Sequence, residues 1–328
     1  MKNNSPYITV LMPVYNAAPF LREAIDSILN QTFKNFELLI INDGSTDNCE
    51  EIILTYKDPR IRYIKNETNI KLISTLNKGI KLSKGKYIVR MDADDISFPD
   101  RIEKQVNYME TNPAIALCGT WFSSFGDRAG ISKYQKDNDE IKFRMLYQCH
   151  LCHPTIIIRK TILDNFDIKY DSNFAHAEDY DFFVRIGEKY LIANIPEVLL
   201  KYRIHTQSIS NYHKIIQDEN SNKVRIRQFK NLGYTISNEL LDDYIKLNYQ
   251  DYEKLKSSSI EIKNMFEQII EKNNESGYLN KKQLNSKIAL LWFHYCYNTH
   301  NRKVFYSSFL SKSKTIGKIN KLKLLIKG

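Results

Sequence analysis

The chain has 328 residues and a mass of 38.6 kDa, and 42% of its residues are hydrophobic, which suffices for one large core and a smaller additional element. No apolar run approaches the roughly 18 residues of a membrane-spanning helix, and the first residues lack a signal-peptide core. These features argue against an integral membrane or exported protein and predict a cytoplasmic one, in which the five cysteines are reduced.

The formal net charge of +10 is concentrated near the C-terminus. No acidic residue follows Glu275, and the residues after it hold 11 of the 48 lysines and arginines. The remainder is close to neutral, with 37 basic and 38 acidic residues. A nucleic-acid partner is therefore not expected, because the basic excess belongs to the tail and not to the body of the protein.

Strands and helices alternate through the first hundred residues. Apolar runs that end in Pro, Asn or Asp predict strands buried on both faces, and apolar residues three or four apart predict helices. Strands are expected at 8–16, 36–42, 61–64 and 87–90, and helices at 18–30, from about 49, and at 72–83, where Lys84-Gly85 supplies a glycine stop. This alternation predicts an α/β fold with a mostly parallel sheet, whose ligand lies beyond the C-terminal ends of the strands.

The pattern is mixed after Pro99. We expect a helix to about Thr111, a second helix that opens at 178–181, and extended segments at 115–125, 155–158 and 198–204. From His213 onward the sequence changes to long charged segments with helical spacing. The sequence therefore predicts two domains, 1–210 and 211–328, the second being an α-helical C-terminal region with a basic tail.

Three aspartates follow the strand at 87–90 directly. Alternate residues at a strand end point the same way, so Asp92 and Asp94 are expected to face one site, and Asp95 to turn toward the backbone of the next segment. Hard carboxylate ligands suit Mg²⁺ or Mn²⁺, and these ions usually accompany a phosphate-bearing partner. The alternative is a solvated, Asp-rich turn before the next helix.

Several motifs occur in an order that resembles family 2 glycosyltransferases. They are Val-Leu-Met-Pro-Val-Tyr-Asn at 10–16, Ile-Asn-Asp-Gly-Ser-Thr-Asp at 41–47, Asn69 with Asn77-Lys78-Gly79, Met-Asp-Ala-Asp-Asp at 91–95, Ala-Glu-Asp-Tyr-Asp at 177–181 and Tyr-Arg-Ile-His at 202–205. The resemblance covers residues 7 to about 210. It implies a GT-A catalytic domain at 1–210, in which helices flank a nucleotide-binding sheet, and it does not extend to the residues that follow.

By resemblance, the turn that contains Pro13, Val14 and Tyr15 holds the uracil of a nucleotide sugar together with Asp43. A carboxylate suits an imide N–H, and backbone donors and acceptors suit the edge of a base. The alternative for the acids of this motif is capping of the next helix, which we expect for Asp47 but not for Asp43.

Asn69 and Asn77 resemble the segment that lines the donor site beside the ribose. The family usually has Gly two residues after the first of these, where this chain has Lys71, and the local backbone path is therefore left open. A lysine at this position could also reach a phosphate, so Lys71 is grouped with the nucleotide-sugar-binding residues.

The metal-binding role is also carried over by resemblance. Asp92, with Ala93, is expected to contact the ribose or a metal-bound water, and Asp94 to bind the divalent ion, Mn²⁺ or Mg²⁺, that bridges the diphosphate. A UDP leaving group accumulates negative charge that such an ion offsets. His205 is expected to be a further metal ligand or a diphosphate contact, and a solvated loop histidine is the alternative.

Asp179 is the expected general base. A sugar hydroxyl is a poor nucleophile near neutral pH, and a carboxylate within hydrogen-bond reach removes its proton as the new bond forms. The neighbouring Glu178 and partial burial are expected to raise the pKa of Asp179. One base opposite the leaving group predicts in-line displacement with inversion. The alternative for Asp179 is a carboxylate at a helix N-terminus, stabilised by the helix dipole.

Together these features predict an inverting glycosyltransferase that moves a hexose or N-acetylhexosamine from a UDP-sugar to a glycan or lipid-linked acceptor in cell-surface polysaccharide biosynthesis. One alternative is a metal-dependent nucleotidyltransferase, against which the lack of a Gly-rich basic phosphate-binding signature argues. Another is a non-catalytic module that binds nucleotide sugars or glycans, which would have no use for the base at position 179.

The segment Cys149-His150-Leu151-Cys152-His153 formally matches a haem-attachment motif. Haem attachment needs export, and a closed zinc site needs four ligands, whereas the remaining cysteines give no second pair. We expect instead that His153 opens a strand beside the acceptor pocket.

Residues 312–327 interleave lysines with apolar residues. Such a segment is typical of one that lies on an anionic membrane surface, where a lipid-linked acceptor would be found. This would make the protein peripheral on the inner face of the cell membrane. The alternative is a solvated lysine-rich end or a docking helix.

Overall fold

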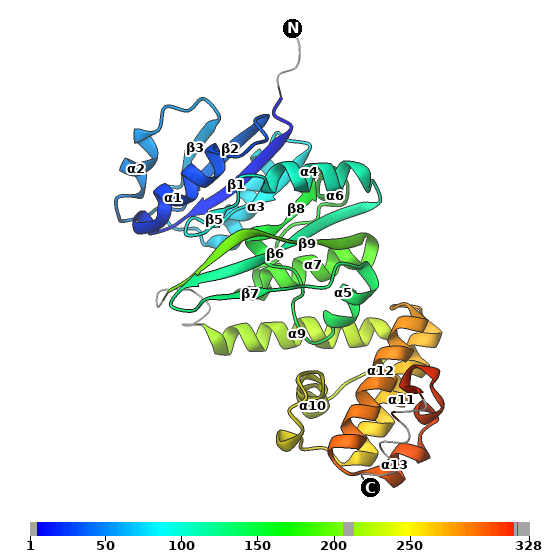
Figure 1. Ribbon diagram of the computed structural model, residues 1–328. Coiled ribbons are helices and arrows are strands. Elements are labelled where there is room, and N and C mark those ends of the chain that lie inside the picture. The colour runs from blue at the N-terminus through cyan, green and yellow to red at the C-terminus, as the bar shows by residue number, and fades with distance from the viewer. Residues whose placement is uncertain (1–4, 206–212, 318–319, 321–328) are drawn as a thin grey trace. The chain divides into compact units, whose positions relative to one another are not determined.

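The computed structural model describes residues 5–205, 213–317 and 320, and the chain forms two compact units (Figure 1). The first unit comprises Met1–Ile141 and Cys149–Ser221, and the second comprises Lys142–Gln148 and Asn222–Gly328. The predicted domain boundary near residue 210 lies outside the described residues.

The first unit is built on one sheet, which has nine strands in the described part of the chain. They are β1 (Ile8–Val14), β2 (Phe36–Asn42), β3 (Ile61–Lys65), β4 (Tyr87–Arg90), β5 (Ile96–Ser97), β6 (Ile115–Gly126), β7 (Gly130–Ser132), β8 (Ile157–Arg159) and β9 (Leu191–Ile204). The order is β3-β2-β1-β4-β8-β6-β9-β5, with β7 paired to β6. The first four are mutually parallel, β8 is antiparallel to both its neighbours, and β9 is parallel to β6 and antiparallel to β5.

Helices flank this sheet, as Figure 1 shows. They are α1 (Ala18–Leu29), α2 (Cys49–Thr55), α3 (Leu72–Leu82), α4 (Arg101–Thr111), α5 (Asn138–Arg144), α6 (Lys160–Phe166) and α7 (Glu178–Lys189). Every residue of β1 and β2 is buried, because side chains cover both faces of these strands, which explains their continuous apolar sequence. The predicted α/β fold is confirmed, with a mixed sheet whose parallel half is β3-β2-β1-β4.

The register of the parallel strands places three strand ends at one edge of the sheet. Val14, the last residue of β1, pairs with Asn42, the last residue of β2, and Leu11 pairs with Arg90, the last residue of β4. The turns that follow these strands therefore start close together. These turns carry most of the site residues that the sequence predicted.

The predicted glycine stop at Lys84-Gly85 does not end helix α3. The helix ends at Leu82, and Ser83 leads the chain away in an extended conformation. Gly85 is needed for a different reason, because a Cβ atom at this position would lie 2.4 Å from the backbone nitrogen of Thr9. The missing side chain lets β4 start directly beside β1.

The second unit is a helical assembly around an aromatic core. Its helices are α9 (Lys214–Leu232), α10 (Asn238–Tyr249), α11 (Ser259–Ser276), α12 (Lys281–Asn298) and α13 (Arg302–Ser307), the first residues of α9 belonging to the first unit. Trp292, Phe266 and Phe305 are fully buried in this core, and residues 142–148 contribute Phe143 and Leu146 to it. Among the described helices, none is both long and apolar enough to cross a membrane. The predicted helical C-terminal region is confirmed.

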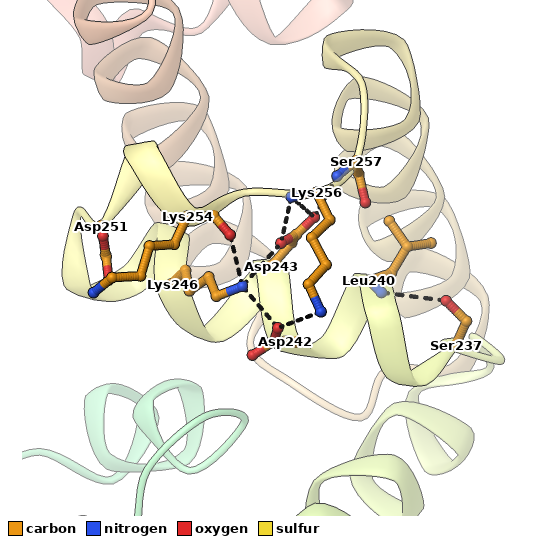
Figure 2. Close-up of polar contacts among 9 residues, drawn as sticks. All are labelled: Ser237, Leu240, Asp242, Asp243, Lys246, Asp251, Lys254, Lys256 and Ser257. Carbon is orange, nitrogen blue, oxygen red and sulfur yellow. Dashed lines mark hydrogen bonds and ion pairs between the residues drawn. The ribbon is translucent and has the colours of Figure 1, made fainter.

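Helix α10 carries a buried carboxylate, Asp243, that accepts backbone hydrogen bonds from the segment after the helix, and Figure 2 shows its surroundings. Asp243 is fully buried and accepts hydrogen bonds from the backbone N–H groups of Lys256 and Ser257, the latter at 2.7 Å. Lys246 lies 3.6 Å from the same carboxylate and 2.7 Å from Asp242. Burial raises the pKa of Asp243, but the hydrogen bonds from Ser257 and Lys256 and the charge of Lys246 outweigh it, so the pKa lies below its usual value.

Candidate active site

An acidic turn leaves the sheet at the end of β4. One carboxylate oxygen from each of Asp92, Asp94 and Asp95 lies within 4.8 Å of the others. Asp95 was predicted to turn toward the backbone of the next segment. Its carboxylate is 1% exposed and belongs to the cluster, and the backbone N–H that donates to it, at 2.8 Å, comes from the distant Arg203. Its other oxygen, Oδ2, is buried and has no hydrogen-bond partner among the described residues.

Two nitrogen-bearing side chains lie beside this cluster. The buried guanidinium of Arg90 forms an ion pair with Asp92, and His205 Nε2 lies 3.0 Å from Asp94 Oδ2. Burial, and then the charges of Asp92 and Asp94, raise the pKa of Asp95 well above its usual value. Burial also raises the pKa of Asp92, against the opposing charge of Arg90. Three crowded carboxylates beside an imidazole fit a hard divalent cation, because such an ion relieves their mutual repulsion.

Arg203 holds the end of β9 against the acidic turn, and sequence reasoning did not single it out. Its guanidinium lies over the rings of Phe20 and Phe125, with centroid distances of 4.6 and 4.4 Å, and forms an ion pair with Glu23. Its Nε donates a hydrogen bond to the Asp94 backbone carbonyl at 2.8 Å. The signal in the sequence was the Tyr-Arg-Ile-His motif itself, in which only the histidine was assigned a role.

The end of β1 and the start of the next turn contain the residues predicted to hold a base. Pro13 and Val14 are buried in β1, whereas the Tyr15 side chain is 49% exposed. Asp43 is buried beside them, and its backbone N–H donates to the Val14 carbonyl at 2.8 Å. Asp43 Oδ1 accepts hydrogen bonds from Asn66 Nδ2 and from the backbone N–H of residue 70. The other oxygen, Oδ2, makes no hydrogen bond to any described residue.

Asp47 serves the two helices that begin near it. Its Oδ1 accepts a hydrogen bond from the Cys49 N–H at 3.1 Å, in the first turn of α2, and its Oδ2 accepts one from the Ala18 N–H at 2.9 Å, in the first turn of α1. A carboxylate at these positions satisfies N–H groups that the helices themselves leave unpaired. The predicted capping role of Asp47 is confirmed, and it extends to a second helix.

Lys71 has a backbone conformation that normally requires glycine. Its φ of 72° and ψ of 157° lie in a region that costs a residue with a side chain on the order of 1–3 kcal/mol. The Lys71 N–H donates to Asn69 Oδ1 at 2.9 Å, and the lysine side chain is exposed. The backbone path that the sequence left open is thus the glycine path, adopted by a lysine.

Asn77 directs its amide to the backbone of a distant residue. Its Nδ2 donates to the Tyr170 carbonyl and its Oδ1 accepts from the Tyr170 N–H, both at 2.9 Å. The Tyr170 ring in turn stacks on Phe182 of α7, with a centroid distance of 4.1 Å. Asn77 therefore joins α3 to the chain that leads into α7, an arrangement that the sequence did not predict.

The pair Glu178 and Asp179 begins helix α7. Asp179 Oδ1 accepts a hydrogen bond from the Tyr180 N–H at 2.7 Å. Burial, and then the charge of Asp179, raise the pKa of Glu178 to about 7. Burial also raises the pKa of Asp179, although the Tyr180 N–H and Arg90 lower it. A carboxylate with a raised pKa is a stronger proton acceptor, and burial is the largest cause of the rise at Asp179.

The end of β4 and the start of α7 face a common region of the first unit. Arg90 of β4 and Phe182 of α7 line one small internal cavity together with Tyr170. Besides the effect of burial, the pKa of Asp179 is lowered by the charge of Arg90 and raised by that of Asp92. Such effects weaken with distance, so Asp179 lies near enough to Arg90 and Asp92 for their charges to act on it.

The side chains of the Cys149–His153 segment take part in local contacts. His150 Nε2 accepts a hydrogen bond from the Gln135 N–H at 2.8 Å, and His153 Nε2 lies 2.8 Å from the Tyr170 hydroxyl. In the described ranges, the three aspartates are the one group of three or more potential metal ligands that converge. His153 opens a short turn, His153–Thr155, and β8 follows it at Ile157.

Comparison with known proteins identifies the family. A model of glycosyl transferase family 2 matches residues 9–166. A Haemophilus influenzae protein described as an uncharacterized glycosyltransferase is 35% identical over 237 residues, which is 68% of this chain and 73% of that protein. This chain belongs to glycosyl transferase family 2. The predicted family and its assignment as a glycosyltransferase are confirmed.

Two further proteins are informative about this family 2 glycosyltransferase. An Escherichia coli relative, UDP-Glc:alpha-D-GlcNAc-diphosphoundecaprenol beta-1,3-glucosyltransferase WfgD, is 29% identical over 244 residues, covering 74% of this chain and 91% of that protein. The mannosyltransferase PcManGT from Pyrobaculum calidifontis, solved with GDP-Man and Mn²⁺, is 15% identical, with a TM-score of 0.55 over 98% of this chain and 87% of that chain. The second likeness supports the fold, which is of the predicted GT-A type.

Proposed function

We propose that this family 2 glycosyltransferase transfers a hexose or N-acetylhexosamine from a UDP-sugar to a hydroxyl of a glycan or lipid-linked acceptor, with inversion at the anomeric carbon. One observation supports the proposal above all: three carboxylates converge at the end of β4, and the charges of Arg90 and Asp92 act on the further carboxylate of Asp179. A glycosyl transfer needs both parts, because the diphosphate leaves with negative charge while the acceptor hydroxyl must lose a proton.

The base of the nucleotide is proposed to bind beside Asp43. Its Oδ1 is occupied by the 66–70 loop, so the position of the carboxylate is fixed, and Oδ2 is available to accept the imide N–H of uracil. Pro13, Val14 and the exposed Tyr15 line the neighbouring turn, and Asn69 and Lys71 follow on the other side. The donor named for the Escherichia coli relative, UDP-Glc, supports uracil.

The diphosphate end of the donor is proposed to lie at the acidic turn. Asp94 and His205 would hold Mn²⁺ or Mg²⁺, with Asp92 and Ala93 beside the ribose and Asp95 completing the carboxylate cluster. When bound, the ion offsets the charge that develops on the departing diphosphate. Two observations support this assignment: the buried Oδ2 of Asp95 has no hydrogen-bond partner among the described residues, and the Pyrobaculum calidifontis structure contains Mn²⁺.

Asp179 is proposed to take the proton of the acceptor hydroxyl. Its raised pKa suits this transfer, and its position at the helix N-terminus leaves one oxygen available after the hydrogen bond from Tyr180. The proposal has one base and no carboxylate that attacks the sugar. The acceptor hydroxyl therefore displaces the diphosphate directly, and the anomeric carbon is inverted. A pure binding protein would gain nothing from a carboxylate that is costly to keep ionised.

The acceptor is proposed to be lipid-linked, and the protein to act at the inner face of a membrane in cell-surface polysaccharide synthesis. The acceptor named for the Escherichia coli relative, a diphosphoundecaprenol derivative, supports this. In the second unit, Tyr306 and Phe309 are exposed in the region after Glu275, which contains basic but no acidic residues. We propose that this helical region is a separate domain, which meets the anionic surface.

A panel of UDP- and GDP-sugars, each tested with Mn²⁺, Mg²⁺ or chelator, tests the proposal through donor hydrolysis and calorimetric binding. We expect ion-dependent binding of UDP-sugars, its loss in Asp94→Ala, and its retention in the control Asp164→Ala, which changes an exposed aspartate of α6. Tighter binding of GDP-sugars, or undiminished ion-dependent binding by Asp94→Ala, would contradict the proposal.

A further inference from the structure

The turn that precedes the proposed base has an unusual backbone. His176, two residues before Glu178, has a φ of 65°, in the left-handed region that side chains disfavour. Ala177, at the N-cap position of α7, has no side-chain oxygen to hold the first N–H groups of the helix. The orientation of this helix start must therefore be stabilised by contacts from elsewhere in the fold.

Two side chains in the first turns of α9 and the residue just before the helix, His213, provide such contacts. Gln217 Nε2 donates a hydrogen bond to the His176 carbonyl at 3.1 Å, and Asn220 Nδ2 donates one to the Ala175 carbonyl at 2.8 Å. The His213 ring stacks on the His176 ring, with a centroid distance of 4.2 Å and an interplanar angle of 10°. Two successive carbonyls and one ring of the turn are thus held by a single helix start.

The three clamping residues lie on one side of the helix. Positions 213, 217 and 220 are separated by four and three residues, the spacing that places side chains on a common face. Asn220 is 6% exposed, so its hydrogen bond to the turn is shielded from water. Gln217 and Asn220 are neutral donors, so they fix the turn without adding a positive charge near Glu178 and Asp179. An added positive charge would lower the pKa of Asp179 and weaken it as a base.

We propose that His213, Gln217 and Asn220 are positioning residues for catalysis, which orient the start of α7 so that Asp179 meets the acceptor hydroxyl. This inference rests on the proposed role of Asp179 as the base. The three side chains contact the turn and not the reacting atoms, so they act through the orientation of Asp179. Small errors in the placement of a catalytic group reduce turnover strongly, whereas donor binding at the acidic turn does not depend on this orientation.

The clamp also gives α9 a role in the reaction. Its residues up to Ser221 belong to the first unit, and from Asn222 the same helix belongs to the second. Fixing the turn from this helix makes the geometry of the base depend on a segment outside the motifs that carry the family resemblance. Sequence reasoning centred on those motifs had no reason to single out Gln217 or Asn220.

The test measures steady-state transfer and donor binding for Gln217→Ala, Asn220→Ala and the double variant. Each single change is expected to lower kcat about 10-fold and the double change about 100-fold, with the donor KM within about twofold of the wild-type value. Glu219→Ala, which changes an exposed residue of the same helix, is the matched control and is expected to keep wild-type turnover. Gln217→Glu, which keeps the side-chain length but removes the donor, is expected to behave like Gln217→Ala.

The same clamp variants are then made in an Asp179→Asn background. If the clamp acts through the base, the clamp variants cause no further loss of kcat in this background, because an asparagine at position 179 cannot act as a base wherever it is placed. An additional 10-fold loss in that background, or wild-type kcat in the single variants, would overturn the clamp and leave the proposed function standing. Wild-type transfer by Asp179→Asn alone would instead refute the base assignment. Thermal unfolding shows whether Asn220→Ala is folded. If this variant does not fold, the variants of Gln217 still carry the test, because Gln217 is partly exposed.

Discussion

Asp243 in the second unit and Asp95 in the first are aspartates with almost no exposed surface, and their environments have opposite effects. Asp243 receives two backbone N–H donors and has Lys246 beside it, and its pKa lies below the usual value. Asp95 has one backbone donor, one oxygen without a described partner and two like charges nearby, and its pKa lies well above the usual value. Burial alone therefore does not mark a functional carboxylate. The balance of donors and like charges around it does.

Glu178 and Asp179 have raised pKa values, as Asp95 does, whereas the pKa of Asp243 is lowered. Burial raises the pKa of both Glu178 and Asp179, and the two charges lie next to each other at one helix start. The first unit thus keeps several carboxylates in a state that opposes their ionisation, whereas the second unit uses a buried carboxylate as a structural link. Substitutions of the first unit's carboxylates are expected to lower activity more than stability, and substitution of Asp243 to lower stability more than activity.

Asp179→Asn should give the largest effect on turnover. The amide keeps the shape but cannot take a proton, so kcat for transfer is expected to fall roughly 10²–10⁴-fold. Donor affinity should stay within about twofold, measured by calorimetry with Mn²⁺, since the diphosphate is proposed to bind at the acidic turn. An equal loss of donor affinity in Asp179→Asn and Asp94→Ala would show that the division of roles is wrong.

Asp243→Ala should give the largest effect on stability. It leaves the N–H groups of Lys256 and Ser257 without their acceptor and Lys246 without a buried partner, so the free energy of unfolding should fall by about 2–4 kcal/mol. Denaturant titration measures this change. Below the unfolding transition, kcat should equal that of the wild type, and a selective loss of catalysis would remove the contrast with Asp95.

Glu178→Gln should stabilise the protein at alkaline pH. The folded pKa of about 7 lies above the ordinary value of 4.5, so the carboxyl favours the folded state while protonated and loses that contribution as the pH rises through 7. The neutral amide avoids this loss, and we expect a gain on the order of 1–3 kcal/mol at pH 8 and almost none at pH 4. Thermal unfolding at the two pH values measures it. The acidic limb of the kcat profile should also move to lower pH, because a like charge beside Asp179 is gone.

Asp95→Asn sharpens the comparison with Asp243 most directly. The amide oxygen can still accept the Arg203 N–H, while the repulsion from Asp92 and Asp94 disappears. With chelator at pH 7, the free energy of unfolding should therefore stay the same or rise by about 1 kcal/mol, the opposite sign to Asp243→Ala. The same variant should lose stabilisation by Mn²⁺, which thermal shift with and without the ion would detect. A strong destabilisation in chelator would place Asp95 with the structural carboxylates.

Lys71→Gly should give the smallest effect. Glycine adopts a φ of 72° without strain but also gains freedom in the unfolded chain, so the net stabilisation should be about 1 kcal/mol or less. The donor KM should rise if the lysine reaches a phosphate. Lys71→Ala, which keeps the strain and removes the ammonium, separates the two effects, and an unchanged KM in both variants would exclude the phosphate contact.

Much of the parallel half of the sheet was predictable from the sequence, because strands buried on both faces leave a continuous apolar signature. Strand β2, Phe36–Asn42, matches its predicted range, and helix α1 ends one residue before its predicted end. The short strands β5 and β8 were harder, since their pairing depends on β9, β4 and β6 and not on local sequence. A strand of two or three residues carries almost no periodicity of its own.

The sequence offered candidate residues for the site, but it could not give the contacts that these residues make. The motifs identified Asp94 and Asp179, whose roles remain proposals, but the partners of other site residues are distant in sequence. Asn77 holds the backbone of Tyr170, and Asp95 holds that of Arg203, across separations of 93 and 108 residues. Such pairings depend on the folded topology. Lys71 shows a further limit, because residue type argues against the backbone conformation that the fold imposes.

The long separation between β5 and its partner strand bears on how the polypeptide is made. Strand β5 hydrogen-bonds to β9, with Ile96 opposite Lys201. The acidic turn accepts hydrogen bonds from Arg203, which also belongs to β9. On the ribosome, the acids of residues 92–95 therefore emerge about a hundred residues before the strand that closes over them. We therefore expect this edge of the sheet to assemble last, because β5 has no partner strand until β9 has left the ribosome. Force measurements on stalled nascent chains should register a late folding step as residues 191–204 leave the ribosome.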